Sequence, residues 1–116
     1  MIVVSTDTIA GKETVQTMGR ARGSTIRARH IGKDIVALLR NVVGREVAEY
    51  TKMMAESREE AVQRMIENAE AQGANAVVGL RFTTSMVMQN AAEILAYGTA
   101  VAVKQLRFII LSVRDR

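Results

Sequence analysis

The fold of this chain is decided by residues 46–73, EVAEYTKMMAESREEAVQRMIENAEAQG. Apolar residues recur there at steps built from three and four, which places them on one helical face: Val47, Tyr50, Met54, Ala61, Met65 and Ala69. Val62 and Ile66 widen this stripe, and charged side chains cover the rest of the surface. Gly73 can adopt the left-handed conformation that often ends a helix. The stretch predicts one long amphipathic helix whose apolar face needs a partner surface.

The segments around this helix have the character of strands. β-branched runs or alternating patterns predict strands over residues 2–6, 14–29, 74–88 and 93–103. We expect the second strand to bend near Gly19–Gly23, because glycine inside a strand usually marks a bulge or a close backbone contact. Residues 89–91, Gln-Asn-Ala, predict a hairpin turn between the last two strands.

A second, shorter helix is expected over about residues 33–42, where apolar residues keep helical spacing. Asp34 near its start and Arg40 near its end both suit the helix dipole. The predicted fold class is therefore α+β, with an antiparallel sheet wrapped around one long helix and a second short helix. One domain covers residues 1–116, with residues 105–116 as a C-terminal tail or an extra edge strand.

One face of the predicted last strand consists mainly of small residues, so another segment can approach it closely. These residues are Ile94, Ala96, Gly98, Ala100 and Ala102. We expect the long helix to pack there, and the alternative is a contact between subunits.

Composition narrows the class of protein. The 116 residues include no Cys, Pro or Trp and one His, and aromatic residues make up 3% against 48% hydrophobic residues. The core must therefore be built from aliphatic side chains, Met and Ala. Without Cys there is no disulfide framework and no thiolate metal site. With no signal-peptide pattern and no run of about 18 apolar residues, we expect a cytoplasmic protein that does not enter the membrane.

The net charge of +4 is unevenly distributed. Residues 1–45 hold eight basic groups against three acidic ones, residues 46–73 three against seven, and residues 74–116 five against two. An acidic helix between basic segments suggests complementary surfaces within one subunit or between subunits.

No constellation for catalysis is recognisable, because nucleophilic catalysis needs a nucleophile, a base and an orienting group. The chain is therefore predicted not to be an enzyme and to carry no cofactor. His30 and Asp34 are four residues apart and could share one face of a helix, but a metal site needs three or more ligands. Several copies of the chain would have to contribute to such a site.

A basic cluster precedes the acidic helix, and it comprises Arg20, Arg22, Arg27, Arg29 and Lys33. These side chains could bind an anion or a nucleic acid, although the interleaved aromatic residues typical of nucleic-acid surfaces are missing. The alternative is that they pair with the acidic helix of the same or a neighbouring subunit.

The stretch Gly73-Ala74-Asn75-Ala76-Val77-Val78-Gly79 resembles the corresponding segment of the YbjQ family. The helix with Tyr50, Arg58 and Ala61 precedes it, and Gly98-Thr99-Ala100-Val101 follows at the expected distance. Ser5-Thr6 and the strand with Gly19 and Gly23 also match that layout, so the resemblance covers about residues 3–104.

The resemblance implies a small α+β subunit that assembles into a ring, most often a homopentamer, which could bind or sequester a small ligand or a metal ion. Members are often labelled heavy-metal-binding, a label that one His and no Cys do not support. The fold is similar to that of dodecin subunits, which bind flavin. The flavin-stacking Trp of dodecins is absent here, so flavin binding is not implied.

Overall fold

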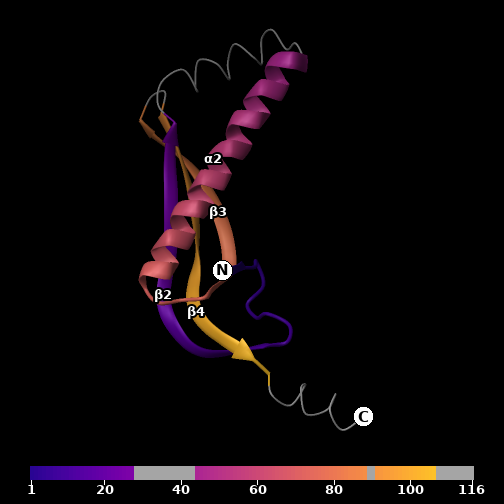
Figure 1. Cartoon of the computed structure of the whole chain (residues 1–116). Coiled ribbons are helices and arrows are strands. Elements are labelled where there is room, and N and C mark those ends of the chain that lie inside the picture. The colour runs from indigo at the N-terminus through magenta and orange to yellow at the C-terminus, as the bar shows by residue number, and fades with distance from the viewer. Residues whose placement is uncertain (28–43, 89–90, 107–116) are drawn as a thin grey trace.

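The computed structural model describes residues 1–27, 44–88 and 91–106 (Figure 1). Its elements are β1 (Ile2–Val3), β2 (Lys12–Arg27), α2 (Gly44–Ala71), β3 (Ala76–Met88) and β4 (Ala91–Gln105). The long helix and the other strands are confirmed with small shifts of their bounds, whereas the first strand, expected over residues 2–6, is limited to Ile2–Val3. The expected short helix at 33–42, two residues of the expected turn and nearly all of the tail lie outside the described residues.

The four strands form one mixed sheet in the order β1-β3-β4-β2. β4 pairs antiparallel with both β2 and β3, whereas β1 pairs parallel with β3 through Ile2–Ala76 and Val3–Val77. The prediction of an entirely antiparallel sheet was therefore wrong for β1. This strand meets β3 only after β2 and α2 have been traversed, so no hairpin dictates its direction.

α2 crosses one face of the sheet diagonally and packs mainly on β2 and β4 (Figure 1). Ala61, Met65 and Ala69 are fully buried at steps of four, as the amphipathic pattern predicts. Ala96 and Ala100 of β4 belong to the same core. The small-residue face of β4 therefore receives the helix of its own subunit, as expected.

The helix and β2 make a backbone-to-backbone contact at Gly23. A Cβ atom placed on Gly23 would lie 2.2 Å from the Met65 amide nitrogen and 2.4 Å from the Ala61 carbonyl oxygen. Only glycine lets the two backbones come this close. Gly23 therefore fixes the position of α2 on the sheet.

Bulges interrupt the alternation that the sequence suggests. In β3 the register shifts between Val78 and Arg81, where Gly79 has a φ of 67°. Val77 and Leu80 consequently both pack toward α2, although simple alternation places them on opposite faces. β2 has two such shifts, between Thr14 and Gln16 and between Thr17 and Gly19.

The far face of the sheet, away from α2, is covered at one end by the chain that follows β1. Val4 and Ile9 pack there against a small buried cluster of Ala76, Val78 and Val101. We call this the β1 end of the sheet. The other end, where β3 stops at Met88 and β4 starts at Ala91, we call the hairpin end.

The molecule is long and thin, with extents of 65 × 30 × 16 Å and a Cα radius of gyration of 19.1 Å. A compact domain of this length has a radius of gyration of about 13 Å. In the part of the chain that the structure describes, no helix is long and apolar enough to cross a bilayer.

Candidate functional site

Two of the basic residues singled out in the sequence lie on β2, on the face away from α2. Ala21 and Gly23 are buried toward the helix, so the alternating residues Arg20 and Arg22 point to the far face, where both are exposed. The structure therefore places this part of the predicted basic cluster on an open surface.

The other predicted site residues are not placed. Arg29, His30, Lys33 and Asp34 lie outside the described residues, and the Arg27 side chain is likewise not described. The predicted metal site at His30 and Asp34, and three of the five residues of the basic cluster, stay predictions.

The far face aligns a tyrosine between two arginines. Arg22 of β2 and Arg81 of β3 are both paired with Tyr97 of β4, so the three residues form one cross-strand row. Directly opposed residues in a sheet have Cβ atoms about 4.5–5.5 Å apart. The sequence did not reveal Arg81 and Tyr97 as partners of Arg22, because they lie about 60 and 75 positions further along the chain and only the sheet register joins them.

The Arg81 guanidinium of this row is hydrogen-bonded to backbone oxygens. Arg81 Nη1 donates to the backbone oxygens of Ser5, at 2.9 Å, and Leu80, at 2.8 Å. Among the described residues, neither Arg22 nor Arg81 has a carboxylate within ion-pair distance. The row Arg22–Tyr97–Arg81 thus presents two positive charges on either side of a tyrosine residue that is 37% exposed.

An open depression of about 570 Å³ adjoins this row and reaches over the edge of β2. Arg22, Ser24, Arg64, Glu93 and Leu95 line it, together with Gly23. Its polarity is mixed, because Glu93 stands among the arginines and the Arg64 guanidinium is paired with Glu60 at 2.6 Å.

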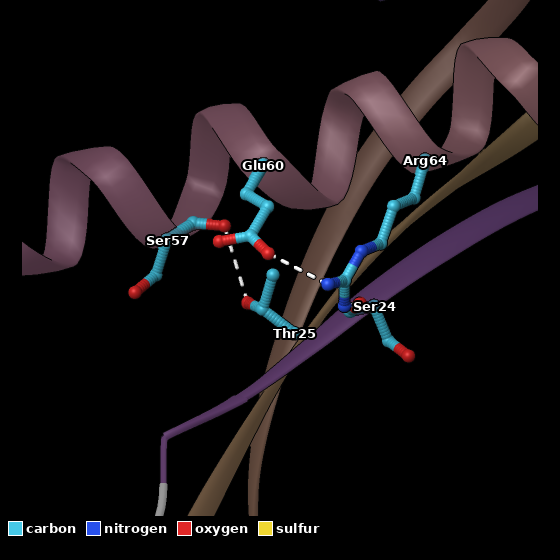
Figure 2. Close-up of polar contacts among 5 residues, drawn as sticks. All are labelled: Ser24, Thr25, Ser57, Glu60 and Arg64. Atoms are coloured by element: carbon cyan, nitrogen blue, oxygen red, sulfur yellow. Dashed lines mark hydrogen bonds and ion pairs between the residues drawn. The ribbon is translucent and has the colours of Figure 1, made fainter.

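Arg64 also bonds to the strand beneath it. Figure 2 shows Arg64 extending from α2 toward Ser24 on β2, beside Glu60. Its Nη1 donates to the Ser24 carbonyl oxygen at 2.6 Å, and close by the Thr25 hydroxyl donates to the Ser57 carbonyl oxygen of α2. The helix is therefore hydrogen-bonded to the outer strand as well as packed on it.

Two further side chains continue these bonds along β2: Asn68, one turn after Arg64 on α2, and Gln72, directly after the last residue of α2. The Arg22 amide donates to Asn68 Oδ1 at 3.2 Å, and Gln72 Nε2 donates to the Arg20 carbonyl oxygen at 2.9 Å. Arg64, Asn68 and Gln72 thus bond the outward-facing backbone groups of β2 as a neighbouring strand would. We call these three side chains the edge ladder.

The opposite edge of the sheet is covered only over part of its length. The chain from Ile2 to Thr6 bonds β3 as far as Gly79 and Leu80, whose amides donate to the Thr6 and Val4 carbonyl oxygens. Beyond Leu80, residues 81–86 are all exposed. No described segment hydrogen-bonds to the outer edge of β3 there.

Within residues 1–27, 44–88 and 91–106, no three His, Cys, Asp or Glu side chains are grouped to hold a metal ion. The described part of the chain therefore supplies no complete ligand set.

A family model, YbjQ, described as "Putative heavy-metal-binding", matches residues 1–104. The chain belongs to the YbjQ family. It is 64% identical over 103 residues to a UPF0145 protein of Methanosarcina acetivorans, covering 89% of this chain and 97% of the relative. It is 57% identical over 105 residues to a UPF0145 protein of Pyrococcus furiosus, covering 90% and 92%. The resemblance noted in the sequence is thus confirmed.

A solved structure also shares the fold of this YbjQ-family chain. The structure is that of a protein of unknown function from the DUF74 family of Pediococcus pentosaceus, with a TM-score of 0.59 and 16% identity. The match covers 90% of this chain and 98% of that one. At this identity the likeness shows the architecture alone.

Proposed function

We propose that this YbjQ-family chain is a non-enzymatic subunit that assembles with copies of itself into a ring, a homopentamer, able to bind or sequester a small ligand. The supporting observation is the hairpin end of β3, which stays exposed among the described residues. Phe82 and Met86 pair with Ala96 and Ala92, so they lie on the α2 side of the sheet, yet they are 43% and 61% exposed.

Within the described part of the chain, this apolar surface is exposed because α2 packs on β2 and β4 and hardly contacts β3. Exposed apolar side chains on an unpaired edge strand invite association. The extended shape supports the same proposal, because a thin subunit buries little of its own surface and neighbours supply the missing cover. The ring of five comes from the family resemblance.

Light scattering on the full chain in solution tests the assembly. We expect a mass five times 12.7 kDa that persists on dilution to micromolar concentration. A particle with the mass of one chain at that concentration would refute self-assembly, and a different multiple would refute the ring of five alone.

A second candidate function is supported by the row Arg22–Tyr97–Arg81. Guanidinium groups bind phosphate through paired hydrogen bonds, and an exposed aromatic ring can stack on a base. We therefore propose that this surface binds single-stranded nucleic acid. A labelled oligothymidylate in a fluorescence titration is the probe.

The test of this second candidate uses Arg22→Gln, with Arg58→Gln as the matched control on the exposed side of α2. Affinity should fall steeply as salt rises, because bound cations are released from the nucleic acid. It should fall several-fold further in Arg22→Gln and stay unchanged in Arg58→Gln. Equal affinity in both variants, or no dependence on salt, refutes the proposal.

The metal-binding alternative concerns His30 and Asp34 of several copies, and its support is the family description alone. Calorimetry with zinc on the oligomer, compared with His30→Ala, tests it. Binding that survives His30→Ala, or no binding at all, excludes a site built on these residues.

A further inference from the structure

We infer that neighbouring copies join head to tail through their sheet edges. The free part of β3, residues 81–88, hydrogen-bonds to residues 12–18 of β2 in a second copy. This inference rests on the proposed self-assembly and names the surfaces that carry it.

The β1 end of the β3 edge is closed to a neighbour. β1 pairs with Ala76 and Val77, and the chain after it accepts hydrogen bonds from Gly79 and Leu80. In the same region Arg81 Nη1 donates to the Ser5 carbonyl oxygen, which holds this chain segment in place. Any neighbour must therefore bind beyond Leu80.

The hairpin end of the β2 edge is closed as well, by the edge ladder. Arg64, Asn68 and Gln72 bond the outer backbone groups of Ser24, Arg22 and Arg20. A strand approaching β2 at this end would have to break all three contacts. The ladder therefore excludes pairing where the helix lies over β2.

Among residues 1–27, 44–88 and 91–106, two half-edges have no hydrogen-bonded neighbour, and they lie diagonally across the sheet. One is β3 from Arg81 at the hairpin end, and the other is β2 from Lys12 to Met18 at the β1 end, where residues 13–17 are exposed. The two segments are eight and seven residues long. Joining one to the other continues the sheet from subunit to subunit with a stagger.

A contact between two different surfaces is heterologous, and repetition of it gives a closed ring or an open filament. The stagger between neighbouring subunits is compatible with a closed ring, because sheets that close on themselves require strands displaced along one another. β2 and β3 both run antiparallel to β4. When successive copies keep the same orientation, the new pairing is therefore parallel.

The side chains of the two half-edges fit one another. Residues 82–88 of β3 carry no charged group, so their edge lacks the charges that usually prevent association. The β2 half-edge contributes Val15, which is 52% exposed. Lys12 and Glu13 lie at the end of this segment, ahead of Val15.

Cross-linking tests the inference directly, because the natural chain has no Cys and introduced thiols are the only ones present. We would prepare Gln16→Cys and Ser85→Cys as full-length variants, both at exposed positions on the two half-edges. They would be mixed, exchanged into common oligomers and treated with a short bis-maleimide. The control replaces Gln16→Cys with Gln63→Cys, an exposed position on α2.

The expected result is a cross-linked pair in the mixture of Gln16→Cys with Ser85→Cys, and none in the control mixture. Cross-linking within Ser85→Cys alone would show that β3 pairs with β3, which overturns the inference. Oligomers of full mass without any cross-link also overturn it, while the proposed self-assembly stands. If the natural chain has the mass of a single subunit, the proposed function fails and the inference with it.

A charge at the same edge gives a second, independent measurement. Met86→Lys places an ammonium group at a position that is 61% exposed in the single subunit, so the subunit itself should fold. We expect the mass to fall at least twofold by light scattering, with the helical circular dichroism signal retained. Gln63→Lys should leave the mass unchanged, and an unchanged mass in Met86→Lys refutes the contact at β3.

Discussion

Gly23→Ala is the substitution to which this fold should be most sensitive. The added Cβ would lie 2.2 Å from the Met65 nitrogen and 2.6 Å from the Arg64 carbonyl carbon, and both are helix backbone atoms. Ordinary contact begins at 3.4 Å, so α2 must move away from β2 by more than 1 Å. No side-chain rotation relieves the overlap.

The cost follows from the contacts that such a displacement disturbs. Overpacking a core costs about 1–3 kcal/mol. The displacement also strains the bonds of Thr25 with Ser57, Arg64 with Ser24 and Arg22 with Asn68, each worth about 1 kcal/mol. Alanine also restricts the conformations of the unfolded chain, which stabilises the folded protein by about 0.4–1 kcal/mol. We expect a net loss of about 3 kcal/mol, a large part of the 5–15 kcal/mol typical of a domain.

Urea unfolding followed by circular dichroism, at one fixed protein concentration, measures this loss. The concentration must match because association adds to apparent stability. Ser24→Ala is the control, since it changes the next residue of β2 but leaves the backbone carbonyl that Arg64 bonds. A Gly23→Ala protein within about 0.5 kcal/mol of the natural chain, the usual scatter of a neutral surface change, would show that α2 does not rest on β2 at this point.

Three further substitutions test individual contacts by the same unfolding assay. Gly79→Ala should lower the free energy of unfolding by about 1–2 kcal/mol, because φ is 67° there, and Gly79→Asn should lower it less. Equal stability of the natural chain and both variants would rule out the bulge conformation. Asn75→Ala should cost about 1–2 kcal/mol, since the Asn75 amide exchanges two hydrogen bonds with the backbone of Val103; no loss would mean that the end of β4 is held by other contacts. Thr25→Val keeps the shape but removes the buried bond to the Ser57 carbonyl, so a loss of about 1 kcal/mol is expected, and a gain in stability would argue against that bond.

The bounds of the main elements could be read from the sequence because their patterns are local. The helix expected over Glu46–Gly73 spans Gly44–Ala71, and the strand expected over 93–103 spans Ala91–Gln105. Helical spacing of Ala61, Met65 and Ala69 fixed which side of α2 is buried. Each of these features depends on neighbours within a few residues along the chain.

Alternation failed where a bulge adds a residue to one strand. The pattern put Val77 and Leu80 on opposite faces, yet both pack toward α2, because Gly79 adopts a positive φ between them. The parallel pairing of β1 escaped prediction for a related reason. A two-residue strand has too little pattern to specify its partner or its direction.

The sequence by itself determined a long amphipathic helix, the strands that cover it and the family to which the chain belongs, since composition and periodicity encode these locally. Only the tertiary structure decided that Arg22, Tyr97 and Arg81 share a row, and that Arg64, Asn68 and Gln72 bond the outer edge of β2. It also decided that no described segment pairs with β3 beyond Leu80. Each of these arrangements joins residues far apart in the chain. Sheet register and the docking of α2 set them, and neither follows from any single stretch of sequence.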